Sequence, residues 1–265
     1  MASTALVKDV LWRASVLLLD TNPQFLRVPE RDMVDYLNDA QLAIAKFMPM
    51  LCSRLDAIKL KQGSRQSIAT IAAADCKPGD GSTPSGPIYG TKLMDVPRNM
   101  GATGLVPGKS IRIVPRKDLD LSDPDWHTRA NTAGVIRTFS YDPMTPGYFY
   151  VSPPVAATPV VWVEVAYAAK PALVPNTGTP GAELYLKDGS NTTTIGVDDQ
   201  CLDDLVNYIV ARANMGDAEW ADGNKASFFA SQFTGSVNAQ AEAALGVNPN
   251  LKRLPFAPTP VGAAS

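Results

Sequence analysis

Apolar residues near the start of the chain recur at the three- and four-residue spacing that places side chains on one face of a helix. Ser3 or Thr4 can cap the start of this pattern, and Asp20-Thr21-Asn22-Pro23 reads as a stop followed by a loop. The pattern predicts a first helix over residues 3–19. Its face holds Leu6, Val10, Arg13, Ala14 and Leu17.

A second helical pattern begins at Pro29, whose missing N–H costs nothing in a first turn. Glu30 and Asp32 suit the positive end of the helix dipole, and Pro49 breaks or kinks the pattern. The two short-linked helices are expected to form an antiparallel pair within residues 1–54. The stripe of the second helix comprises Val34, Leu37, Gln41, Ile44 and Met48, with Met33, Ala40 and Phe47 beside it.

The character of the chain changes over residues 55–197, where short β-prone runs alternate with turn signals such as Asp142-Pro143. This alternation predicts a β-rich insertion, a small antiparallel domain with long loops. A hairpin is expected near residues 184–195, around Asp188-Gly189. The other predicted strands are 57–60, 67–71, 110–114, 134–141, 148–151 and 160–167.

Helical spacing returns over residues 198–246, where it predicts a C-terminal helix pair. The first of these helices begins at Asp198 and carries Leu202, Leu205, Val206, Ile209 and Ala213 on one face. The second runs from about 217 to 245, with Phe229, Phe233, Val237 and Ala241 four residues apart and Gly246 placed to end it.

The last segment, residues 247–265, contains four prolines and cannot form a helix. The patterns together predict an α+β protein. Its helical bundle is built from the N- and C-terminal helix pairs, a β-rich insertion projects from the bundle, and an extended C-terminal tail follows. The expected domains are residues 1–54, 55–197, 198–246 and 247–265.

Charge and composition narrow the class of function. The chain of 265 residues has 24 Lys and Arg against 26 Asp and Glu, a formal net charge of −2. Such a chain lacks the net positive charge with which proteins bind DNA or an anionic membrane. No signal peptide and no apolar run of membrane-spanning length stands out, so the protein is expected to be made in the cytoplasm without membrane contact.

Candidates for catalysis are few. The single histidine, His127, is the one candidate general base, and we interpret it as a loop or interface residue. Residues 101–110 end in Gly-Lys-Ser like a phosphate-binding loop. Their glycine spacing is wrong, however, and Ser110 opens a strand-like run instead of the helix that would hold a phosphate. We therefore predict no catalytic residue and no nucleotide cofactor.

Candidates for metal binding are equally weak. Cys52, Cys76, His127 and Cys201 are spaced too widely for a zinc site, and three cysteines imply no disulfide framework. Asp198, Asp199, Asp203 and Asp204 are interpreted as a solvated helix start. The densest basic group, Arg112, Arg116 and Lys117, is expected to be a solvated loop or a subunit contact. No metal site is predicted.

Four strings carry a resemblance. Asp9-Val10-Leu11-Trp12-Arg13-Ala14 lies in the first predicted helix, and Arg31-Asp32-Met33-Val34-Asp35-Tyr36-Leu37-Asn38-Asp39-Ala40-Gln41 runs through the second. Asp203-Asp204-Leu205-Val206-Asn207-Tyr208-Ile209-Val210-Ala211-Arg212-Ala213 lies in the third, and Asn248-Pro249-Asn250-Leu251 in the tail. These strings resemble the head-to-tail adaptor (connector) proteins of tailed, in particular short-tailed, bacteriophages.

The resemblance implies a structural, non-enzymatic virion protein at the head–tail junction. It implies a homo-oligomeric ring, a dodecamer, that sits under the portal ring and accepts the tail nozzle or tube protein on its lower face. The ring would continue the channel for genome retention and ejection, so that double-stranded DNA makes only passive contact with it.

The resemblance also implies that the C-terminal extension docks onto the portal, and the tail's apolar anchors suit such docking. In this sequence the expected docking residues are Leu251, Leu254, Pro255 and Phe256. A tail without a docking role stays open. Two other functions stay open as well: a tail-tube or nozzle subunit with the β block at the ring contacts, and a hydrolase that uses His127.

Overall fold

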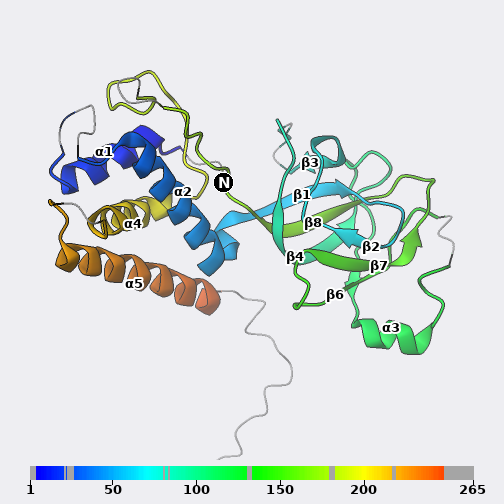
Figure 1. Ribbon diagram of the computed structural model, residues 1–265. Helices are drawn as coiled ribbons and strands as arrows, with labels where there is room; N and C mark the ends of the chain where they lie inside the picture. Colours follow the sequence, from blue (N-terminus) through cyan, green and yellow to red (C-terminus); the bar gives the residue numbers. More distant parts are fainter. Residues whose placement is uncertain are drawn as a thin grey trace, which may run out of the picture. The chain divides into compact units, whose positions relative to one another are not determined.

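A computed structural model describes residues 4–20, 22, 27–79, 81–82, 84–129, 133–178, 183–216 and 219–247 (Figure 1). The chain divides into two compact units. The unit that we call the helical unit comprises Ala5–Ala40, Val174–Thr194 and Gln200–Ser265. The β unit comprises Met1–Thr4, Gln41–Leu173 and Ile195–Asp199. Each unit therefore joins segments that are distant in the sequence.

The first helix, α1 (Val7–Leu17), is shorter than predicted and presents a different face. Val7, Val10, Leu11 and Ala14 are buried, whereas the predicted Leu17 is 45% exposed. The buried stripe continues to Leu18 after the helix, which turns Leu17 outward. The predicted cap is also wrong at Thr4. The N-cap residue is Leu6, and the Thr4 backbone N–H donates instead to the Asp199 carboxylate at 3.1 Å.

The second helix, α2 (Glu30–Phe47), follows the prediction closely. The carbonyl of Pro29 accepts the N–H groups of Asp32 and Met33, so the proline directly precedes the helix. The helix ends two residues before Pro49, as expected for a residue that cannot continue the hydrogen-bond ladder. The predicted stripe is buried, but Phe47 beside it is 54% exposed.

Helices from both ends of the chain form one bundle, as predicted. The third long helix, α4 (Leu202–Asn214), packs against α1 and against α5 (Gly223–Val247), and Figure 1 shows α1 and α5 on opposite sides of α4. Tyr208 of α4 meets Phe233 of α5 edge to face, with 5.0 Å between ring centroids. The last helix starts later than predicted and runs through Gly246, so the predicted glycine stop is wrong.

The predicted hairpin over residues 184–195 is also wrong. A turn does occur around Asp188-Gly189, but the described residues of this segment form no strand pair with each other. The segment is held by the N-terminal helices instead. The Glu30 carboxylate accepts the backbone N–H groups of Leu184 and Tyr185, both at 2.8 Å. A buried carboxylate and the buried Tyr185 ring thus outcompete local strand pairing.

The β unit contains two four-stranded sheets, with strand orders β3-β1-β8-β4 and β2-β7-β6-β5. All neighbours are antiparallel except β5 and β6, which pair in parallel. The strands are β1 (Ser53–Lys59), β2 (Gly63–Ser67), β3 (Cys76–Pro78), β4 (Gly90–Asn99), β5 (Arg112–Ile113), β6 (Thr138–Tyr141), β7 (Tyr148–Val155) and β8 (Trp162–Ala169).

One hydrophobic core is shared by the two sheets. Val163, Val165 and Tyr167 enter it from β8, and Phe149 and Val151 enter it from β7. Alternation along β8 therefore has the period of two that predicted a strand there. The α+β class predicted from the sequence is confirmed, with an N- and C-terminal helical bundle and two central sheets.

Several elements of the β unit differ from the prediction. The strand expected at residues 67–71 lies earlier, as β2. Its residues are mostly polar because β2 is the edge strand of its sheet, so it lacks the apolar pattern that predicts a strand. Strand β4 was missed because its ladder with β8 is interrupted at three points, which removes the regular alternation. The short helix α3 (Arg116–Ser122) was missed because none of its residues is buried. The domain limits at residues 54, 197 and 246 stay predictions.

Candidate functional site

The contact between α4 and α5 includes a buried carboxylate. Asp204 is 2% exposed, and the Gln240 side-chain amide donates to its Oδ2 at 3.0 Å. The adjacent Asp203 has a side chain that is 91% exposed and lies 3.7 Å from Arg13. The interpretation of this acidic group as a solvated helix start is therefore right for Asp203 and wrong for Asp204. Asp204 instead joins the two C-terminal helices.

Two amide side chains of the second quoted string, those of Asn38 and Gln41, bind the chain where it leaves and re-enters the β unit. Within the helical unit, Asn38 exchanges two hydrogen bonds with the backbone of Val174, at 2.8 and 3.0 Å. Within the β unit, the side-chain oxygen Oε1 of Gln41 accepts the N–H of Gly196. A Cβ at Gly196 would lie 2.4 Å from the Ala172 carbonyl oxygen, so this approach requires glycine. These side chains have structural roles.

The two units differ in charge. Counted over the full sequence, the β unit has 15 Lys and Arg against 12 Asp and Glu, a formal charge of +3. The helical unit has 9 against 14, a formal charge of −5. A net charge near zero over the whole chain therefore conceals an unequal distribution, with an acidic helical unit and a weakly basic β unit.

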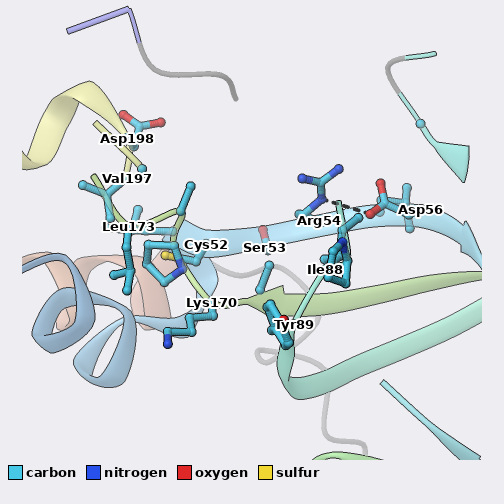
Figure 2. Close-up of a pocket in the computed structure, with 18 residues that line it drawn as sticks. Cys52, Ser53, Arg54, Asp56, Ile88, Tyr89, Lys170, Leu173, Val197 and Asp198 are labelled. Atoms are coloured by element: carbon cyan, nitrogen blue, oxygen red, sulfur yellow. Dashed lines mark hydrogen bonds and ion pairs between the residues drawn. The ribbon is translucent and has the colours of Figure 1, made fainter. Parts of the chain in front are cut away.

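The β unit has an open cleft of about 770 Å³ beside the start of β1 (Figure 2). Strand β1 pairs with β8 along its whole length, whereas β3 reaches only Asp56, Ala57 and Ile58. Among the described strands, Ser53–Leu55 therefore have a neighbour on the β8 side alone. Three large apolar side chains in the cleft are about half exposed, namely Leu55, Tyr89 and Leu173.

A buried polar network closes one side of this cleft. Arg54 Nε and the Tyr167 hydroxyl both donate to Asp56 Oδ2, at 2.9 and 2.7 Å. Burial, together with the Asp56 charge, raises the pKa of the Cys76 thiol to about 12. Burial and the hydrogen bond to Asp56 also raise the pKa of Tyr167. Burial opposes the charge on Arg54, but the hydrogen bond and charge of Asp56 prevail and raise the pKa of Arg54.

This network stabilises the sheet and offers no reactive group. A thiol and a phenol with raised pKa values stay protonated at neutral pH, so neither is a nucleophile there. The sequence pattern did not predict the burial of Asp56. An aspartate directly before a predicted strand is expected at a surface turn, and a buried position there requires a cationic or hydroxyl partner.

The single histidine packs in an aromatic cluster. The His127 ring stacks on Trp126 with 3.6 Å between centroids, and its Nδ1 lies 3.0 Å from Ser64 Oγ. Trp126 is 2% exposed and donates from its indole N–H to Asp120 at 2.8 Å. Arg116 lies over the Tyr150 ring at 4.9 Å. The cluster anchors the chain after α3 onto the β2–β7 sheet, as expected for a loop histidine.

The other candidates from the sequence are not brought together. Ser110 forms an isolated bridge with Arg98 just before β5, so it opens an extended run and not a helix, as predicted. Within the described parts of the chain, no three Cys, His, Asp or Glu side chains form a group that could hold a metal ion. The proposed docking residues Leu251, Leu254, Pro255 and Phe256 lie outside the described residues.

A family model described as SU10 adaptor protein matches residues 6–253, almost the whole chain. The chain belongs to the SU10 adaptor protein family. This SU10 adaptor is thus a phage head-to-tail adaptor, as the resemblance of its helices implied. The match spans α1, α2, the β unit, α4 and α5, so the β insertion is part of the family's pattern too. No curated protein matches the chain.

Membership of the family makes the SU10 adaptor a structural protein that contacts other virion proteins. It gives no role to His127 beyond the packing described above. No helix in the described ranges is both long and apolar enough to cross a membrane.

Proposed function

We propose that copies of this adaptor form a ring, a dodecamer, that connects the portal to the tail. The observation that carries the proposal is the family match over residues 6–253. The ring continues the DNA channel for genome retention and ejection, and its lower face accepts the tail nozzle or tube protein. The site of action is the head–tail junction of the virion, after assembly in the host cytoplasm.

The charge distribution supports passive contact with DNA. A helical unit with a formal charge of −5 repels a phosphate backbone, so a channel with this unit near its wall lets double-stranded DNA slide. Tight binding would instead require the clustered Lys and Arg that release counterions from DNA.

The tail is proposed to attach the adaptor to the portal. It follows α5 directly, and its apolar anchors are Leu251, Leu254, Pro255 and Phe256. Proline restricts the unbound conformations of such a segment, which lowers the entropy cost of docking in an extended form. A folded subunit with an extended anchor can then bind a preformed portal ring one copy at a time.

The experiment is a binding measurement with purified portal rings of the same phage. Alanine at Leu251, Leu254, Pro255 and Phe256 is expected to weaken binding about tenfold or more, since buried apolar anchors dominate such interfaces. The matched control is alanine at Thr259, Pro260, Val261 and Ser265 of the same tail, which is expected to bind like the wild type. Equal binding by both variants would contradict the tail assignment.

The two sheets favour a second candidate function, that of a tail-tube or nozzle subunit whose ring contacts lie in the β unit. The same mixture distinguishes it. A protein that ignores portal rings but polymerises alone or with a tail component would support this alternative.

A further inference from the structure

We draw no further inference here: the strongest candidate, the open cleft beside the start of β1 where Leu55, Tyr89 and Leu173 are about half exposed, is an unpartnered apolar surface, and nothing in the structure shows what covers it.

Discussion

The neighbouring aspartates at the start of α4 give the sharpest test of how the C-terminal helices are joined. Asp204 is 2% exposed and accepts a hydrogen bond from Gln240 across the helix pair, whereas the Asp203 side chain is 91% exposed. Replacing each by alanine changes the same charge in the same helix turn. Only the change at Asp204 removes a contact between α4 and α5.

The magnitude follows from three contributions. A hydrogen bond to a charged group is worth about 1.5–3 kcal/mol. The favourable position of Asp204 in the first turn of α4 adds about 0.3–1 kcal/mol. Relief of the desolvation cost of a buried carboxylate offsets part of this sum. We expect Asp204→Ala to lower the free energy of unfolding by about 2 kcal/mol, and Asp203→Ala to change it by less than about 0.5 kcal/mol.

The assay is thermal unfolding followed by circular dichroism at 222 nm, with a double-mutant cycle of Asp204→Ala and Gln240→Ala. A loss of about 2 kcal/mol corresponds to a fall in Tm of about 4–8 °C for a chain of this size. The cycle is expected to give a coupling energy of about 1 kcal/mol or more. Equal effects of Asp203→Ala and Asp204→Ala, or a coupling energy near zero, would refute the assignment.

Three further predictions follow from the buried polar groups. Glu30→Ala removes the acceptor of two backbone N–H groups in the 183–194 segment, so limited trypsin digestion is expected to cut faster at Lys187; an unchanged rate would count against this anchor. Asn99 makes three side-chain hydrogen bonds, to the backbone of Lys109 and Ile136, so Asn99→Ala is expected to cost about 2–3 kcal/mol in urea unfolding. Because burial raises the pKa of Cys76 from 9.0 to about 12, the unfolded chain loses this proton first as the pH rises. The contribution of the protonated thiol to the free energy of unfolding is therefore fully present below pH 9. It is lost between pH 9 and 12, by at most about 1.4 kcal/mol per pH unit, and Cys76→Ala should flatten this fall.

The helical ends could be predicted because their signals are local. Val34, Leu37, Gln41 and Ile44 repeat at helical spacing, and Pro49 stops the pattern. The buried face of α1 was harder to predict because several apolar residues in a row fit more than one stripe. Only the packed bundle determines that Leu18 points inward and Leu17 outward. A residue that sequence periodicity assigned to the core thereby becomes part of an exposed surface.

The β unit was harder to predict because its signals depend on distant partners. Asp56 is buried only because Arg54 and Tyr167 neutralise and bind its carboxylate. The Glu30 carboxylate likewise fixes a segment about 150 residues later in the chain, which no local pattern encodes.

The central claim is that this adaptor forms a ring on the portal. The most direct measurement is electron microscopy of purified portal rings mixed with purified adaptor, with copies counted by native mass spectrometry. The account predicts one closed adaptor ring on each portal, with twelve copies, and none when residues 248–265 are removed. Portal rings that stay bare in the presence of excess adaptor would contradict it.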